Sequence, residues 1–161
     1  MITPYEFEQL FFAILFHDTI YSPTAPKGEN ESQSALFGAQ VLAQRGVTSE
    51  TIERVVKHII LTSNHTVESD NLIEKFMIDI DLSILGQDWF TYERYAYAMR
   101  HDEYKIYPDH IYVAGRIAFL EGMLERQVFQ TPLFQERYET IAKDNMKKEL
   151  EILKNNRKFF T

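Results

Sequence analysis

The stretch "TPYEFEQLFFAILFHD", residues 3–18, carries the signals of a helix that is mostly buried. Thr3 is typical of an N-cap, Pro4 of the first helical position, and Glu6 of the reciprocal partner in a capping box. Apolar side chains then recur at the spacing of a helix, at Leu10, Phe11, Ile14, Leu15 and Phe16. We therefore predict a first helix that ends near His17.

Cap signals and helical periodicity continue along the rest of the chain. Further helices are predicted over about 30–46, 48–61, 70–86, 88–100, 108–124 and 131–156. Ser69 or Asp70 is expected to cap the fourth helix of the chain. Strict alternation of apolar and polar residues is rare, so strands are not expected. The predicted fold class is all-α: a single-domain bundle of about seven helices over residues 1–161.

Composition limits the partners and the chemistry. The net charge of −7 argues against broad binding to nucleic-acid phosphates. The chain has no cysteine, so any metal would have to be held by His, Asp and Glu. Neither an 18-residue apolar run nor a signal-peptide pattern is found, and a cytoplasmic protein without a membrane partner is expected.

Several potential metal ligands lie in or beside apolar helices. His17 and Asp18 follow the first helix, whereas a second His-Asp pair, His101-Asp102, lies in the charged stretch "RHDEYK" and is interpreted as solvated. In "IDIDLSILG", residues 78–86, two carboxylates interrupt an apolar helix, and a buried carboxylate needs a charged partner or a metal. A salt bridge to Lys or Arg is the alternative. His58 and His65 are each either ligands or structural residues.

An ordered series of short motifs adds to this interpretation: "FHDTIYS", "NESQSA", "LTSNH", "DIDLSILG", "YERYAYAMRHDEY" and "AGRIAFLEGML". The series resembles a family of predicted metal-dependent phosphohydrolases of the HD superfamily, which are small all-helical proteins. The resemblance covers almost all of residues 10 to 150. It implies an HD-domain-like fold and a metal-dependent phosphohydrolase.

The resemblance also implies roles for particular residues. His17, Asp18 and Asp81 correspond to metal ligands, with Asp79 as the competing choice for the last. Asp18 would also orient the attacking water. His65 corresponds to a histidine that contacts substrate phosphate or a second metal, and acts in catalysis. The positions implied on the substrate side are Glu31, Arg100 and Arg116, although both arginines are equally typical of structural ion pairs.

The implied cofactor is a divalent metal ion such as Mn, Fe, Mg or Ni, and the implied substrate is a nucleotide or similar small phosphate ester. Members of the family carry a further ligand histidine upstream, but no His precedes His17. The resemblance is therefore to a shortened member. Either water, His65 or His58 completes the ligand shell, or a longer natural protein exists, or the site no longer holds metal. If the site no longer holds metal, the protein would either bind a nucleotide or serve as an oligomeric interaction module. A homo-oligomer is one expected assembly.

Overall fold

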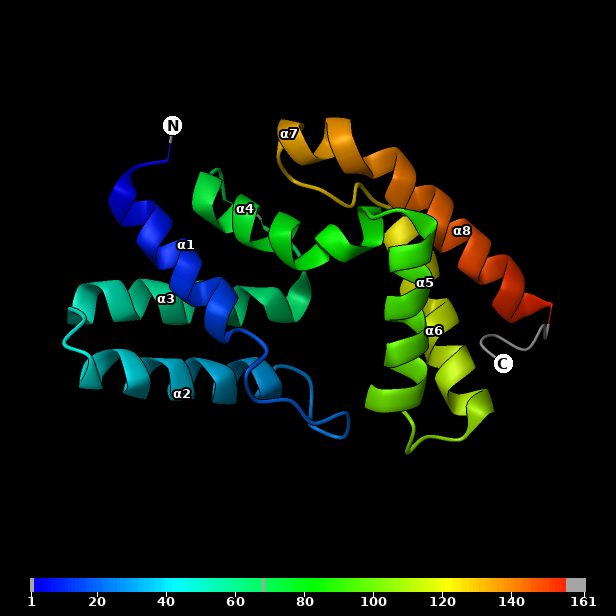
Figure 1. Cartoon of the computed structure of the whole chain (residues 1–161), viewed down its shortest axis with the longest axis horizontal. Helices are drawn as coiled ribbons and strands as arrows, with labels where there is room; N and C mark the ends of the chain where they lie inside the picture. The colour runs from blue at the N-terminus through cyan, green and yellow to red at the C-terminus, as the bar shows by residue number, and fades with distance from the viewer. Residues whose placement is uncertain (1, 68, 156–161) are drawn as a thin grey trace. The chain divides into compact units, whose positions relative to one another are not determined.

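The computed structural model describes residues 2–67 and 69–155. Within these ranges the chain is helical, with no strand, and the predicted all-α class is confirmed. Seven of the described α-helices have ten or more residues. The elements are α1 Pro4–Phe16, α2 Glu29–Gln44, α3 Ser49–Leu61, η1 Thr62–Asn64, α4 Leu72–Asp81, η2 Leu82–Gly86, α5 Trp89–Ala98, η3 Met99–Glu103, α6 Asp109–Leu124, α7 Pro132–Phe134, η4 Gln135–Glu139 and α8 Thr140–Lys154 (Figure 1).

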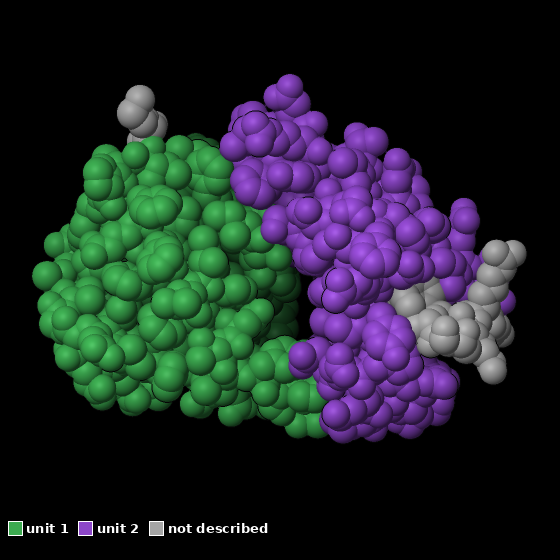
Figure 2. All heavy atoms as spheres, in the orientation of Figure 1, with its two compact units in different colours: residues 1–81 green, residues 82–161 purple. Residues whose placement is uncertain are grey.

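The chain divides into two compact units, residues 1–81 and residues 82–161 (Figure 2). Unit 1 contains α1 to α4, and unit 2 contains η2 and α5 to α8. The sequence predicts one domain over residues 1–161. The two compact units do not test whether they form one domain, so this remains a prediction. None of the helices in the described part of the chain combines the length and apolar character needed to cross a bilayer.

The start of α1 has the predicted capping box. The Thr3 hydroxyl accepts a hydrogen bond from the Glu6 backbone N–H at 3.2 Å, and the Glu6 carboxylate accepts one from the Thr3 N–H at 2.8 Å. Two backbone donors that the helix itself leaves unpaired are thereby satisfied. This fixes where α1 begins and, through its length, where His17 falls.

The predicted cap of α4 is wrong. The Asn71 side-chain oxygen, rather than Ser69 or Asp70, accepts from the backbone N–H groups of Ile73 and Glu74, at 2.9 and 3.3 Å. Ser69 is engaged elsewhere, because its hydroxyl donates to the Glu74 carboxylate. All three residues are good caps, and the sequence alone does not show which one lies next to the first turn.

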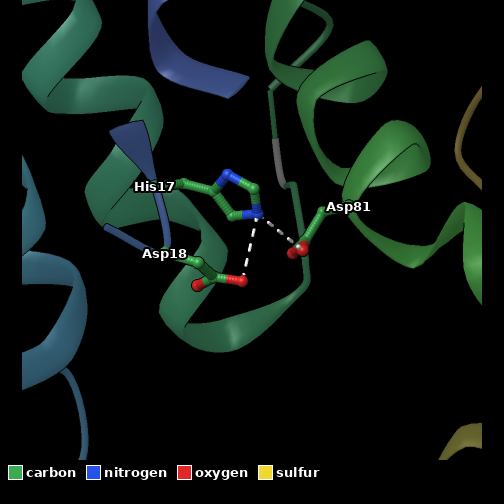
Figure 3. A group of neighbouring side chains, drawn as sticks. All are labelled: His17, Asp18 and Asp81. Atoms are coloured by element: carbon green, nitrogen blue, oxygen red, sulfur yellow. Dashed lines mark ion pairs between the residues drawn. The ribbon is translucent and has the colours of Figure 1, made fainter. Parts of the chain in front are cut away.

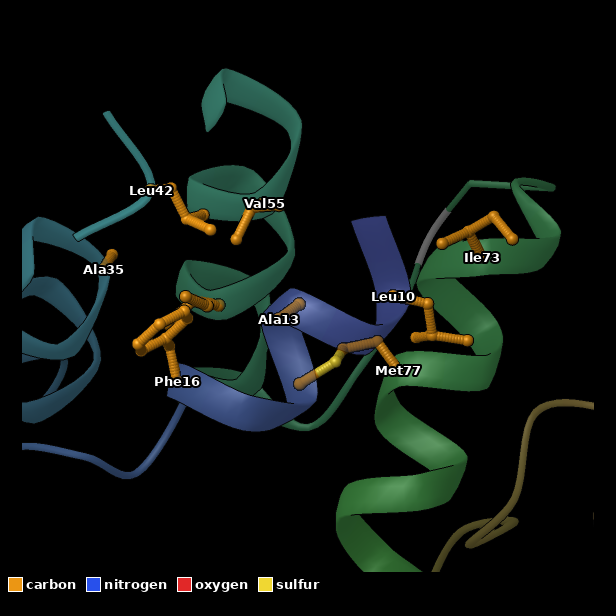
Figure 4. Packing of buried hydrophobic residues seen from close by; sticks show 9 residues of the cluster. Leu10, Ala13, Phe16, Ala35, Leu42, Val55, Ile73 and Met77 are labelled. Atoms are coloured by element: carbon orange, nitrogen blue, oxygen red, sulfur yellow. The ribbon is translucent and has the colours of Figure 1, made fainter. Parts of the chain in front are cut away.

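Apolar side chains from all four helices form the core of unit 1 (Figure 4). Its members are Leu10, Ala13, Phe16, Ala35, Leu42, Val55, Ile59, Ile73 and Met77. Each large side chain of this kind contributes roughly 1.5–3 kcal/mol when fully buried. Gly38 lets α2 approach α1, because a Cβ at this position would lie only 3.0 Å from Cγ of Phe16.

Unit 2 is built around a buried polar cluster. The Arg116 guanidinium of α6 donates to both carboxylate oxygens of Glu149 on α8, at 2.8 and 3.0 Å, and the Tyr92 hydroxyl of α5 donates to the same carboxylate. Asn145 donates to the backbone carbonyls of Leu85 and Gln87. The cluster therefore joins α5, α6 and α8 by hydrogen bonds that satisfy a buried charge pair.

Candidate metal centre

His17 lies directly after α1, and the helix fixes the orientation of its ring. Nδ1 is 2.8 Å from the backbone carbonyl oxygen of Ile14, which can only accept a hydrogen bond, so Nδ1 carries a proton. Nε2 then faces two carboxylates, Oδ2 of Asp18 at 3.3 Å and Oδ1 of Asp81 at 3.4 Å (Figure 3). A backbone carbonyl that fixes the far nitrogen is a common partner of metal-ligating histidines.

Of the two candidate carboxylates on α4, Asp81 is the one at this centre. It is the last residue of α4, and its side chain is 14% exposed, whereas Asp79 is fully buried. Two residues apart on a helix, the side chains point about 200° apart, so one helix cannot aim both at the same point. The structure thus places Asp81, and not Asp79, beside His17.

One ligand atom from each of His17, Asp18 and Asp81 lies within 4.8 Å of the other two. Two donors about 2.1 Å from one ion are about 3 to 4.2 Å apart, so small side-chain shifts would fit this set to one cation. In addition, Oδ2 of Asp81 is buried, and although Nε2 of His65 lies 3.5 Å away, it accepts no hydrogen bond from the residues that the structure describes. Leaving such an oxygen unsatisfied is costly, and a cation would satisfy it. The donor set therefore fits a small divalent ion.

The electrostatics of the centre favour positive charge. Burial lowers the pKa of His17, but the hydrogen bond to Asp81 and the charge of Asp18 outweigh it and raise the pKa to about 9. The pKa of Asp18 is raised, first by loss of water around its carboxylate and then by the charges of Asp81 and Glu31. Two carboxylates that repel each other next to an imidazole form a site where a cation relieves the repulsion.

His65 approaches the centre from a third direction. It follows η1, and its Nε2 lies 3.5 Å from Oδ2 of Asp81. Its backbone has φ of 50°, a left-handed conformation that is uncommon outside glycine but less so for His. Ahead of it, at the C-cap of α3, the buried Thr62 hydroxyl donates to the Ile59 carbonyl at 2.7 Å. This turn directs the His65 ring toward Asp81.

The remaining predicted site residues lie in two groups. Glu31, in the first turn of α2, is half-buried and close enough to Asp18 for its charge to raise the pKa of Asp18. Arg100 and Arg116 lie in unit 2, where each is in an ion pair. Arg100 pairs with Asp109, and Arg116 has the buried pair described above. Contact of these three residues with a substrate stays a prediction.

His58 and His101 lie outside the cluster formed by His17, Asp18 and Asp81. His58 is buried within α3 and 4% exposed, and burial lowers its pKa. His101 is exposed, as is Asp102, in agreement with the solvated interpretation of this pair. Of the histidines considered for completing the shell, His65 is therefore the one that the structure shows next to a ligand.

The centre lies where helices end. His17 follows α1, His65 follows the turn after α3, and Asp81 ends α4. The carboxyl end of a helix carries partial negative charge, which stabilises cations. The meeting of His17 and Asp18 with Asp81 was expected from the sequence, whereas the Ile14 carbonyl was not. The carbonyl could have been found, because a ring at a helix end can reach the carbonyl three residues earlier.

No protein-family model matches the chain, and neither a curated protein nor a solved structure is significantly similar to it. The assignment to the HD superfamily stays a prediction from the motif series.

Proposed function

We propose that the protein is a metal-dependent phosphohydrolase of the HD type, acting on a nucleotide or a similar small phosphate ester. The observation that carries the proposal is the approach of His17, Asp18 and Asp81 to within 4.8 Å of one another. These are mixed imidazole and carboxylate donors, which suit ions such as Mn²⁺, Fe²⁺, Ni²⁺ or Mg²⁺. The order of the sequence motifs supports the same class.

The proposal gives each residue a separate task. His17 and Asp81 would hold the ion, with the Ile14 carbonyl keeping Nε2 of His17 directed at it. The ion, when bound, supplies positive charge that polarises a phosphoryl oxygen and makes water a better nucleophile. Asp18, whose side chain is 68% exposed, would ligate and also accept a hydrogen bond from the attacking water.

His65 and Glu31 would act on the substrate side. Nε2 of His65, beside Asp81, would donate a proton to the leaving oxygen or balance charge on the phosphate. Glu31 is acidic and would repel a phosphate, so we assign it to a substrate hydroxyl or a water. This division predicts that the two residues affect turnover more than metal affinity.

A second candidate function is a site that holds no metal and binds a nucleotide without hydrolysing it. The pKa of His17, which is raised to about 9, supports only the metal-free part of this candidate. At neutral pH the imidazolium would itself be the positive charge between Asp18 and Asp81. The two candidates differ in whether a divalent ion displaces this proton.

The deciding experiment measures metal binding and hydrolysis on the same preparations. Binding of Mn²⁺, Ni²⁺ and Mg²⁺ is followed by calorimetry, and phosphate release is followed over a panel of nucleoside mono-, di- and triphosphates. Asp81→Asn keeps the shape of the side chain and removes its charge. Asp70→Asn is the matched control, because Asp70 is fully exposed and pairs only with Lys75 among the described residues.

We expect one ion per chain and turnover of at least one nucleotide for the unchanged protein and for Asp70→Asn. Asp81→Asn should lose both while remaining folded. A folded protein that binds none of the ions and releases no phosphate would contradict the hydrolase. Thermal stabilisation by nucleotides without metal would then support the second candidate.

A further inference from the structure

The outer face of α1 carries a stripe of exposed apolar side chains. Phe7, Phe11 and Leu15 are 62, 53 and 57% exposed. They are spaced four residues apart and so form one row along the helix. The buried residues Gln9, Ala13 and Phe16 of α1 lie on the opposite side. We call Phe7, Phe11 and Leu15 the α1 stripe.

We propose that the α1 stripe is the contact surface of a homodimer, in which α1 of a second copy packs on it nearly antiparallel. The proposal concerns unit 1 alone and does not depend on metal binding or hydrolysis. Rows of exposed large apolar residues on one helix face are typical of surfaces that are covered by a partner. The pattern of this row indicates which partner fits it.

The stripe is complementary to itself. Phe11 is at its centre, with an apolar residue four positions away on each side. A second α1 in the opposite direction therefore places Phe7 against Leu15 of the second copy, and Leu15 against Phe7. Phe11 meets its own equivalent at the two-fold axis. This correspondence of a patch with itself is what a two-fold symmetric dimer requires.

The charges at the ends of the stripe also fit this direction. Helix α1 contains no Lys or Arg, and Asp18 follows its carboxyl end. In an antiparallel pair Asp18 lies near the amino end of the other α1, where the helix dipole is positive. Glu8, at the edge of the stripe, comes opposite Ile14 and not another acid. A parallel pair would instead place Asp18 beside Asp18, where two like charges repel.

The size of the stripe predicts a dimer that dissociates on dilution. An aromatic side chain buries about 150–250 Å² when fully covered, and about half of each stripe residue is available. The three side chains then contribute roughly 300 Å² per copy. Even with a polar rim, the total lies near or below the roughly 1,200 Å² of a standard interface.

The test is the molar mass in solution as a function of concentration, by sedimentation velocity. The unchanged protein should rise from 19.0 kDa toward twice that mass. Phe11→Glu should shift the midpoint of association at least tenfold to higher concentration, because two carboxylates would meet at the axis. Leu36→Glu is the matched control, since Leu36 on α2 is 55% exposed and lies off the stripe. It should dimerise normally.

A charge-complementation pair tests the symmetry itself. Phe11→Lys alone should also be monomeric, but a mixture of Phe11→Lys and Phe11→Glu should dimerise, because opposite charges then face each other at the axis. Circular dichroism verifies that each variant is folded. A protein that stays at 19.0 kDa throughout, or a Phe11→Glu variant that dimerises like Leu36→Glu, would overturn the proposal. A mixture that fails to dimerise would overturn the antiparallel arrangement.

Discussion

Nε2 of His17 lies 3.4 Å from Oδ1 of Asp81, so the end of α1 meets the end of α4. The contact joins the first helix of unit 1 to its last helix. With Asp18 it forms the group of ligand atoms on which the proposed function depends. Each of the following outcomes would test one physical consequence of this structure.

Asp81→Asn and Asp79→Asn should affect different properties, the first metal affinity and the second stability. Asp81→Asn removes a proposed metal ligand. Mutating a residue that only orients a ligand typically lowers metal affinity 10- to 100-fold, so removing the Asp81 carboxylate should lower the affinity at least as much. Asp79 is fully buried away from the three ligand atoms, so Asp79→Asn should lower stability but leave metal affinity within threefold. Calorimetric titration with Mn²⁺ and urea unfolding measure the two effects. Equal loss of affinity in both variants would contradict the placement of Asp81.

The stability of the metal-free protein should fall as pH rises from about 6.5 to about 9. The pKa of His17 is raised from 6.5 to about 9, so below pH 6.5 the ring is protonated in both folded and unfolded chains and its ion pairs contribute fully. Above 6.5 only the folded state keeps the proton, and the contribution disappears near pH 9. The loss should be on the order of 3 kcal/mol.

Urea unfolding in EDTA at several pH values measures this dependence. His17→Gln is the control, because it removes the titrating ring, and its profile should be flatter over the same interval. An unchanged slope in His17→Gln would contradict the assignment. Metal affinity should change in the opposite sense and rise with pH, since the ion must displace the His17 proton.

His65→Asn should separate turnover from metal binding. Asn tolerates the left-handed backbone conformation at this position at least as well as His, so the turn is kept while the imidazole is lost. We expect turnover to fall by about 10²- to 10⁴-fold, the usual contribution of a general acid, and metal affinity to change less than tenfold. If affinity fell as much as turnover, His65 would be a metal ligand instead.

Gly38→Ala and Gly115→Ala are a matched pair of helical substitutions. A Cβ on Gly38 would lie 3.0 Å from Cγ of Phe16, the residue before His17, whereas a Cβ on Gly115 meets nothing within 4 Å. Gly115→Ala should stabilise the protein by about 0.5–1 kcal/mol through helix propensity. Gly38→Ala should destabilise it by about 1–3 kcal/mol through overpacking. Thermal unfolding measures both, and a stabilising Gly38→Ala would show that Phe16 yields freely.

Arg116→Met should destabilise the protein strongly. It would leave the Glu149 carboxylate buried without its cation, which costs about 3–5 kcal/mol. The double variant Arg116→Met with Glu149→Leu should recover most of this loss, because no buried charge remains. Urea unfolding measures the difference. A double variant as unstable as the single one would indicate that Arg116 contributes more by packing than by charge.

Helix periodicity and caps in the sequence predicted most of the fold, because both signals are local. The capping box of Thr3 and Glu6 predicted the start of α1, and the helix predicted over 108–124 agrees with α6 at both ends to within one residue. The cap of α4 was mispredicted, since three adjacent residues there have similar propensities. The division into two units depends on contacts between distant residues, and no local signal reports it.

The sequence predicted which residues form the candidate site better than it predicted how their side chains are arranged. Apolar surroundings selected His17 and Asp18 over His101 and Asp102. The choice between Asp79 and Asp81 depended on the rotation of α4 about its axis, which periodicity in an almost wholly apolar helix does not fix. The left-handed backbone conformation of His65 was not predicted, because nothing in "TSNHT" requires a positive φ at this residue.

Under the proposed metal binding by His17, Asp18 and Asp81, the positions of these residues in the sequence would set an order of events during biosynthesis. His17 and Asp18 leave the ribosome more than sixty residues before Asp81, so a nascent chain lacks the complete ligand set until α4 has emerged. An ion would then be captured only by a chain whose four-helix unit has already assembled. A bound ion would consequently indicate that residues 1–81 have folded. When metal is scarce, the unit would still fold, with the protonated His17 ring taking the place of the ion between Asp18 and Asp81.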